Sequence, residues 1–309
     1  MARIIVVGGA QMKAEPYDGR APLVKRMLEM MREAKARGCD IIVYPELALS
    51  PFFVLEWVDD LDDVNHFYEK EMPGPETRPL FDEAAKLEIG FYLGYAEYAE
   101  CGNTPKRYNA SVLVDKNAKI VGKYRKVHLP GHAEYREGMP YQGLEKYYFD
   151  VGDLGFGVWR TMGGVMGMCI CNDRRWAETY RVMGLKGVEL IMLGYNTPNS
   201  IPWDTTYDQL SYFHNHLVMQ AGAYQNSTFV AGVARVGNTG PCELIGGSAI
   251  IAPSGEIIAC ASSKEDELIV GRCELDLAQK YKQTVFNFEE HRRTEHYGII
   301  TEQIGAKSP

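Results

Sequence analysis

The sequence has several shortages, and each of them excludes a class of protein. None of its apolar runs approaches the roughly 18 uninterrupted residues of a membrane-spanning helix, and the apolar start MARIIVVGGAQM is too short and glycine-rich for a secretion signal. Basic residues are in deficit, with 33 Lys and Arg against 41 Asp and Glu and a net charge of -8. This deficit argues against general binding of nucleic acids or anionic membranes. We therefore expect a soluble, cytoplasmic protein.

A disulfide framework and the common cofactor motifs are also missing. The seven cysteines, an odd number scattered over 309 residues, are Cys39, Cys101, Cys169, Cys171, Cys242, Cys260 and Cys273. This usage is typical of reduced thiols. His214 and His216 fall on different faces of an expected helix, and the chain lacks H-E-x-x-H, a P-loop and G-x-G-x-x-G. We expect no bound cofactor and no metal.

What the chain does contain is an alternation of long buried strands and helices, which indicates an α/β fold with mixed sheets. It opens with a strand at 4–10, an amphipathic helix at 22–38 and a strand at 40–49. Gly38 stands where a helix end favours a positive φ. Further helices are expected near 78–88, 176–187 and 205–225. A strand, a turn and a second strand are expected within 159–171, and further strands at 89–98, 108–115, 119–126, 188–196, 227–236, 246–253, 255–262 and 268–275.

No shift in composition and no flexible linker divides the chain, so we expect residues 1–309 to form a single domain. A long irregular segment at 128–153 is rich in glycine, proline and aromatics, and loops of that length commonly build a site. The polar tail at 279–309 still carries aromatic residues such as Phe286 and Phe288. We expect this tail to pack on a partner subunit.

Glu46, in IIVYPELAL, follows a run that is apolar on both faces. Ligands of open α/β sheets lie beyond the carboxyl ends of the strands, and Glu46 is expected at such an end. A glutamate at an ordinary solvated strand exit would give the same pattern.

Basic residues gather in KIVGKYRKVHLPGH, where Lys123, Arg125, Lys126 and His128 fall within six residues of an acidic protein. Strand alternation would put Lys126 and His128 on one side of the strand. An exposed basic edge strand, which discourages edge pairing, is the alternative interpretation.

The stretch MCICNDRRW ends an apolar run in two cysteines and then becomes charged. Cys169 and Cys171 share one face of the expected strand, and Cys171 comes last. Asp173 is positioned to cap the following helix, and the N-terminus of a helix stabilises a nearby thiolate. This arrangement favours a nucleophile at Cys171 and a core position for Cys169. A thiol redox or metal-binding protein built on both cysteines is the alternative, although a redox pair favours C-x-x-C.

Taken together, Glu46 in YPELAL, Lys126 in KYRKVHLPG and Cys171 in MGMCICNDRRW resemble the Glu-Lys-Cys triad motifs of the nitrilase, or carbon-nitrogen hydrolase, superfamily. The resemblance covers nearly the whole chain. PELALSPFF, EMPGP, VMGLKG and GYNTP look like the branch of N-carbamoyl-D-amino acid amidohydrolases. The resemblance implies a four-layer αββα sandwich of two mixed β-sheets flanked by helices, and a homodimer or homotetramer.

The resemblance also implies roles for the triad. Cys171 would be the nucleophile, Glu46 the general base and then acid, and Lys126 the oxyanion stabiliser, assisted by the backbone N–H of Asn172. The reaction would convert an N-carbamoyl-D-amino acid into the D-amino acid, ammonia and carbon dioxide through a covalent intermediate on the cysteine. A β-ureidopropionase or an aliphatic amidase is the alternative within the superfamily.

Two arginines directly after the nucleophile suggest how a substrate carboxylate would be held. The guanidinium groups of Arg174 and Arg175 match a carboxylate bidentately, although local pairing with Asp173 and Glu178 would explain them as well. By resemblance, the remaining substrate contacts would come from Asn196 on the carboxylate, and from His128 and Glu145 on the carbamoyl group or on the triad.

Overall fold

The computed structural model describes residues 2–100, 104–201 and 208–308. Its strands are β1 (Ile4–Lys13), β2 (Ile41–Val43), β3 (Tyr68–Glu69), β4 (Gly90–Ala99), β5 (Lys106–Val114), β6 (Ile120–Arg125), β7 (Val158–Thr161), β8 (Gly164–Ile170), β9 (Leu190–Tyr195), β10 (Phe229–Asn238), β11 (Glu243–Ile245), β12 (Ala249–Ile251), β13 (Ile257–Cys260) and β14 (Glu267–Glu274). Its α-helices are α1 (Arg20–Ala36), α2 (Arg78–Leu87), α3 (Glu145–Tyr148), α4 (Ala177–Leu185), α5 (Ser211–Asn226), α6 (Asp276–Lys282), α7 (Phe288–His291) and α8 (Ile299–Glu302). Short 3-10 turns are η1 (Phe53–Leu55), η2 (Leu61–Phe67), η3 (Cys171–Arg175) and η5 (Thr294–His296).

The strands form two mixed sheets that face one another. The strand order is β6-β5-β4-β2-β1 on one side and β10-β9-β8-β7 on the other, with β14 antiparallel to β1 and β12 antiparallel to β10. The two halves join where β1 runs parallel to β10, with Met12 opposite Arg235. Because β2, β8 and β9 each lie in parallel pairs, their carboxyl ends point toward one region of the molecule.

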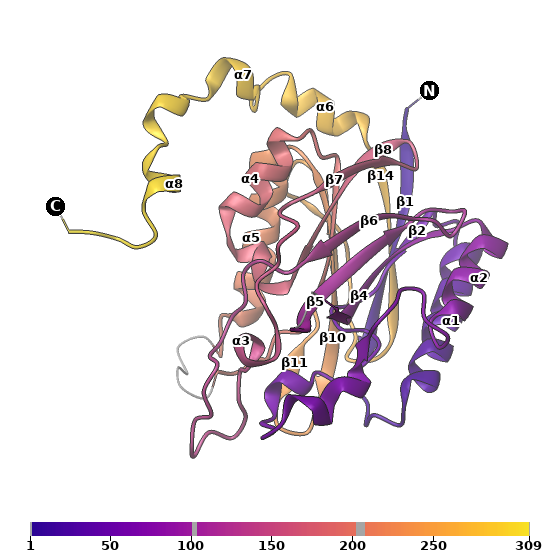
Figure 1. Ribbon diagram of the computed structural model, residues 1–309. Helices are drawn as coiled ribbons and strands as arrows, with labels where there is room; N and C mark the ends of the chain where they lie inside the picture. Colours follow the sequence, from indigo (N-terminus) through magenta and orange to yellow (C-terminus); the bar gives the residue numbers. More distant parts are fainter. Residues whose placement is uncertain (1, 101–103, 202–207, 309) are drawn as a thin grey trace.

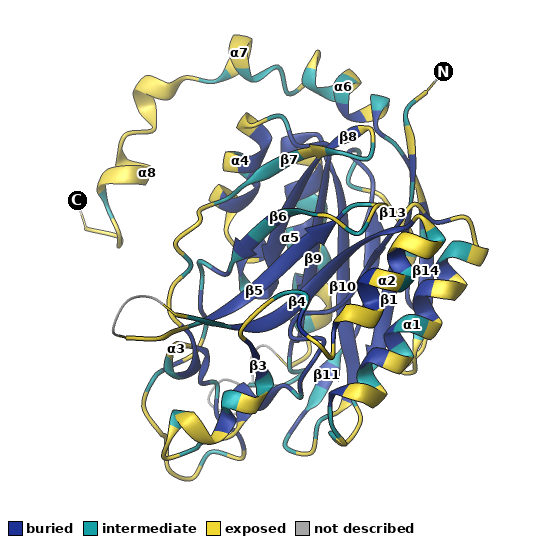
Figure 2. Cartoon of the chain, turned by 45° about the vertical axis from the view of Figure 1, so that its right-hand side comes forward, coloured by how far each residue is buried: buried dark blue, intermediate teal, exposed yellow. Residues whose placement is uncertain are grey.

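The layers follow from the apolar faces of these elements. Side chains such as Val7, Tyr92 and Leu193 fill the space between the sheets. On the outer face of the first sheet, Met27 and Met31 of α1 belong to a second core. Figure 1 shows α1 and α2 on this side and α4 and α5 on the opposite side. In Figure 2 the strands are mostly buried while the outer helices expose one side. The expected αββα sandwich is confirmed.

Most expected elements are present, and the differences lie at their ends. The strand expected at 40–49 ends at Val43, and the chain enters a turn at Glu46, three residues after the strand. The expectation that Lys126 and His128 share a strand face is also wrong, since β6 ends at Arg125. Gly38 has the expected positive φ of 79°. The segment 128–153 contains only the single turn of α3, and the start of the helix expected at 205–225 lies partly outside the described residues.

The C-terminal tail runs over its own chain and then leaves it. The ring of Phe286 meets that of Tyr224 edge-on at 4.9 Å, and the guanidinium of Arg181 lies 4.3 Å from the centre of the Phe288 ring. Beyond these contacts α8 is exposed and lies apart from the sandwich (Figures 1 and 2). None of the helices in the described part of the chain combines the length and apolar character needed to cross a membrane.

Candidate active site

Glu46 lies in a tight turn after β2, wedged between two glycines. A Cβ at Gly94 on β4 would lie 2.9 Å from Cα of Glu46, and a Cβ at Gly194 on β9 would lie 2.2 Å from its backbone nitrogen. Such distances are far inside van der Waals contact, so any larger residue would push the turn away. Both glycines therefore fix where the Glu46 side chain begins.

The Glu46 carboxylate is fully buried, and three groups donate hydrogen bonds to it. Its Oε1 accepts from Nζ of Lys126 at 2.7 Å and from Nδ2 of Asn109 at 2.8 Å, while its Oε2 accepts from the backbone N–H of Asn196 at 2.9 Å. The side-chain amide of Asn196 donates to the backbone carbonyl of Glu46 at 2.9 Å. The carboxylate is thus held in one orientation, with lone-pair capacity remaining on Oε2.

Lys126 follows β6 and bridges two carboxylates. Its Nζ lies 2.5 Å from Oε2 of Glu145 at the start of α3, as well as 2.7 Å from Glu46. Burial alone would lower the pKa of Lys126, but the acidic groups around it, Cys171, Glu145 and Glu46, outweigh burial and raise that pKa above its ordinary value. An ammonium group has three N–H donors, so one remains for a further acceptor.

Glu145 is the second carboxylate of the cluster and is also buried. Burial raises its pKa above the ordinary value, helped by the charge of Glu46 and opposed by Lys126. This carboxyl group therefore holds a proton more readily than an exposed glutamate does.

Cys171 is the first residue of η3, immediately after β8. Its φ is +48°, an uncommon conformation for a residue with a side chain, and the residue is 3% exposed. The ligand atoms of Cys171, Glu46 and Glu145 all lie within 4.8 Å of one another. Burial and the charge of Glu46 raise the pKa of the Cys171 thiol, against the effect of Lys126. The sulfur therefore starts as a thiol and needs a base beside it.

These same three residues have the ligand types of a metal site, but a cation already stands among them. The ammonium of Lys126 donates to Glu46 and to Glu145, where a metal ion would bind those carboxylates. The arrangement fits a nucleophile with its base better than a metal centre.

Asp173 does not cap the helix after it, and that expectation is wrong. The helix α4 begins after Trp176 and has no side-chain cap. Instead Asp173 closes the η3 turn, because its Oδ2 accepts the N–H of Ile170 at 3.0 Å and the hydroxyl of Tyr124 at 2.7 Å. The strained turn that carries Cys171 is therefore fixed by a buried carboxylate.

Arg174 and Arg175 differ in their burial and in their contacts. Arg174 is 1% exposed, and its guanidinium donates to the carbonyl of Cys171 at 2.7 Å, to Asn215 at 3.0 Å and to Thr197 at 2.9 Å. Three of the five N–H groups of this guanidinium are thus engaged inside the protein, and contact of Arg174 with a substrate carboxylate stays a prediction. Arg175 is exposed, and its Nη1 donates to Oδ1 of Asn172 at 3.2 Å.

A cavity of about 450 Å³ opens over the cluster. Cys171, Glu145, Arg175 and Asn196 all line it. Its other walls are largely apolar and come from Phe52, Val54, Leu55, Pro130, Tyr141, Pro198, Ile201 and Val218. Cavities of this size that combine apolar walls with a few polar groups are typical of small-molecule sites.

His128 and the Asn172 side chain lie outside this cavity and line a second hollow. The ring of His128 stacks on Trp176 at 5.0 Å, and its Nδ1 lies 2.8 Å from Oδ1 of Asp173. The structure therefore corrects the expectation that His128 contacts the carbamoyl group or the triad directly, since it supports the η3 turn through Asp173.

Comparison with known proteins adds the family. A family model described as carbon-nitrogen hydrolase matches residues 6–283. The chain belongs to the carbon-nitrogen hydrolase family. An N-carbamoylputrescine amidase of Arabidopsis thaliana is 30% identical over 287 residues, covering 89% of each chain. A citrullinase of Francisella tularensis is 32% identical over 289 residues, covering 92% of this chain and 94% of the relative.

Solved structures agree on the fold of this carbon-nitrogen hydrolase. A carbon-nitrogen hydrolase from Helicobacter pylori matches with a TM-score of 0.83 at 20% identity, covering 98% of this chain and 99% of that one. Nit3 of Saccharomyces cerevisiae, a member of branch 10 of the nitrilase superfamily, matches with a TM-score of 0.75 at 20% identity, covering 95% and 97%. The family match, the two relatives and the buried cluster show that the chain is a hydrolase of carbamoyl or amide substrates with a Glu-Lys-Cys-type site.

Several residues that build this hydrolase site could not be assigned a role from the sequence. Asn109 matches a glycosylation pattern, yet it is 1% exposed on β5 and orients Glu46. Its signal was a polar residue inside the apolar strand YNASVLV, next to the strand that Lys126 follows. Gly94 and Gly194, which pack against the Glu46 turn, could not be identified from the sequence, because a glycine carries no functional group.

Replacing Gly194 by alanine tests whether the close packing of this glycine against the backbone fixes the position of Glu46. The new Cβ would force the Glu46 turn to move, and we expect kcat/KM to fall by about 100-fold, because displacements near 1 Å at a catalytic group have effects of that size. Steady-state kinetics and thermal unfolding measure the result. Gly305→Ala is the control, since a Cβ there meets nothing within 4 Å. Activity of Gly194→Ala within threefold of the control would contradict this account.

Proposed function

We propose that this hydrolase converts N-carbamoyl-D-amino acids into D-amino acids, ammonia and carbon dioxide. The observation that carries the proposal is the charge of the substrate cavity. Arg175 offers an exposed guanidinium to the cavity, and Glu145, the one carboxylate among its described lining residues, is already paired with Lys126. A substrate with a carboxylate beside the carbamoyl group therefore fits the cavity better than one with a distal cation.

The apolar walls support a substrate whose side chain is bulky and uncharged. Phe52, Leu55 and Tyr141 form part of a cavity of about 450 Å³, which is roomy enough for an aromatic carbamoyl amino acid. The D configuration is taken from the resemblance to the D-specific branch, through motifs such as CNDRRW and GYNTP.

The first chemical step follows from the protonation states. Glu46 takes the proton of the Cys171 thiol as the sulfur attacks the carbamoyl carbon, which forms a C–S bond and a tetrahedral intermediate. The remaining N–H of Lys126 and the backbone N–H of Asn172 stabilise the developing oxyanion. Each such donor contributes about 3 kcal/mol to lowering the barrier. The sulfur must stay reduced, in keeping with the proposed cytoplasmic location.

The second half of the cycle returns the enzyme to its starting state. Glu46 gives its proton to the departing nitrogen, the C–N bond breaks, and a carbonyl remains attached to the sulfur. Glu46 then activates a water molecule, which attacks that carbonyl and releases the thiol. The second C–N bond is broken when the resulting carbamic acid decomposes, so that one ammonia, one carbon dioxide and one amino acid leave.

A second candidate function comes from the named relatives. The similarity to an N-carbamoylputrescine amidase, at 30% identity, supports a substrate that has an ammonium group in place of the carboxylate. Arg175 in the cavity would repel such a group, and no described lining carboxylate is free to bind it. We therefore rank this substrate below the carbamoyl amino acids.

A substrate panel separates these candidates. We expect release of ammonia and amino acid from N-carbamoyl-D-phenylalanine at a kcat/KM at least tenfold above that for N-carbamoyl-L-phenylalanine, N-carbamoyl-β-alanine, N-carbamoylputrescine and citrulline. The Cys171→Ala protein is the blank, and Cys169→Ala should keep most of the activity because a hydrolase needs one sulfur. Turnover restricted to N-carbamoyl-β-alanine or to N-carbamoylputrescine would refute the D-amino acid assignment.

Arg175→Ala tests the carboxylate contact. We expect kcat/KM for N-carbamoyl-D-phenylalanine to fall by about 10- to 100-fold, because hydrogen bonds to charged groups contribute about 1.5–3 kcal/mol. A neutral amide such as phenylacetamide should lose less than threefold. Arg160→Ala, which removes an exposed arginine on β7, is the matched control. Equal losses on the charged and the neutral substrate would show that Arg175 does not read the carboxylate.

We also propose that the chain forms a homodimer that can pair into a tetramer. Apolar side chains are exposed on α4, α5 and the tail, among them Leu185, Phe213, Leu217, Ile299 and Ile300. Light scattering after size-exclusion chromatography should give twice or four times the mass of one chain, and the double variant Phe213→Glu, Leu217→Glu should lower it, because burying carboxylates opposes association. Lys116→Glu on an exposed turn is the control. A wild-type monomer at micromolar concentration would overturn the proposal.

A further inference from the structure

Arg235 is a buried arginine that the mechanism above does not use. It lies on β10 at the junction of the two sheets, opposite Met12 of β1, and is 5% exposed. Its Nη2 donates to the backbone carbonyl of Leu47 at 2.9 Å. Leu47 directly follows Glu46 and has a φ of +48°, so this hydrogen bond holds a strained residue of the turn that carries the base.

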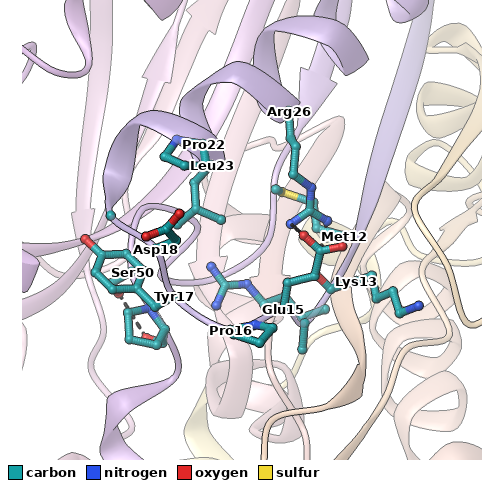
Figure 3. A pocket seen from close by; sticks show the side chains of 14 residues that line it. Met12, Lys13, Glu15, Pro16, Tyr17, Asp18, Pro22, Leu23, Arg26 and Ser50 are labelled. Atoms are coloured by element: carbon teal, nitrogen blue, oxygen red, sulfur yellow. Dashed lines mark hydrogen bonds and ion pairs between the residues drawn. The ribbon is translucent and has the colours of Figure 1, made fainter.

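The surroundings of Arg235 leave its charge without a local partner. It lines the small cavity in Figure 3, of about 40 Å³, and a neighbouring one of about 130 Å³. The other cations of the first cavity are neutralised: Arg26 pairs with Glu15 at 3.2 Å and with Asp266, and Lys13 pairs with Glu265. In Figure 3 the side chains of Arg26 and Glu15 meet at one side of this cavity. Among the described residues, Arg235 forms no ion pair.

Burying a charge without an ion-pair partner costs free energy, so the role of Arg235 depends on the groups that it does contact. Burial and the nearby Arg26 lower the pKa of Arg235 to about 10, and the negative charge of Glu46 acts in the opposite direction. The guanidinium thus stays charged at neutral pH, and its hydrogen bond to the Leu47 carbonyl is a charged one, which is stronger than a hydrogen bond between neutral groups.

We propose that Arg235 is a positioning residue for the general base, holding the Glu46–Leu47 turn through a charged hydrogen bond to the Leu47 carbonyl. This inference rests on the proposed role of Glu46. Lys126 donates to the Glu46 carboxylate, and Glu145 and Cys171 line the substrate cavity, whereas Arg235 reaches the backbone that follows Glu46.

The separate values of kcat and KM report the proposed effect. We expect Arg235→Met to lower kcat by about 10- to 100-fold with KM changed by less than about threefold, because a displaced base slows the chemical step more than it weakens substrate binding. Arg235→Lys keeps a charged donor for the Leu47 carbonyl and should recover most of kcat. Arg26→Met, which removes a paired guanidinium of the same cavity, is the matched control and should leave both values unchanged.

The outcomes separate this inference from the function itself. An unchanged kcat in Arg235→Met would overturn the proposal, as would equal losses of kcat in the methionine and lysine variants. Thermal unfolding identifies a variant that fails to fold, and Arg235→Leu then takes the place of Arg235→Met with the same expected loss. Absence of turnover by the wild-type enzyme on carbamoyl and amide compounds would instead refute the proposed function.

Discussion

The buried contact between Lys126 and Glu46 is the interaction on which the rest of the site depends. Removing an ion from water costs several kcal/mol, and a broken buried pair costs about 3–5 kcal/mol, so neither side chain is stable there without the other. Glu145 adds a second acceptor to the ammonium. The ends of β2 and β6 and the start of α3 are therefore held at one point, although they are far apart in the sequence.

Holding those ends together requires close approach of backbones, which explains features that look unrelated to the chemistry. Gly94 and Gly194 let the Glu46 turn sit directly against β4 and β9. Asn109 and Asn196 supply hydrogen bonds that a buried carboxylate would otherwise lack. The site is consequently a property of the sandwich: the strands that form the hydrophobic core also set the positions of the charged groups.

Hydrophobic periodicity predicted the alternating strands and helices of a mixed α/β fold, whereas the αββα layers and the triad roles came from the family resemblance. It did not predict where the strands end, so Glu46 and Lys126 were expected on strands when both follow them. Contacts between residues that are far apart in the sequence could not be predicted either. Nothing local indicates that Asn109 meets Glu46, 63 residues away, or that Asp173 closes its own turn. Such partners depend on how the strands are paired.

Arg174 is buried and Arg175 is exposed because of the geometry of η3. A 3-10 turn has about three residues per turn, so each side chain lies over the residue three positions before it. Arg174 accordingly reaches back to the carbonyl of Cys171, and Arg175 reaches back to the side chain of Asn172. One arginine stabilises the turn of the nucleophile, while the next lines the substrate cavity. Because both belong to one short turn, the backbone that carries the sulfur also carries a cation to that cavity.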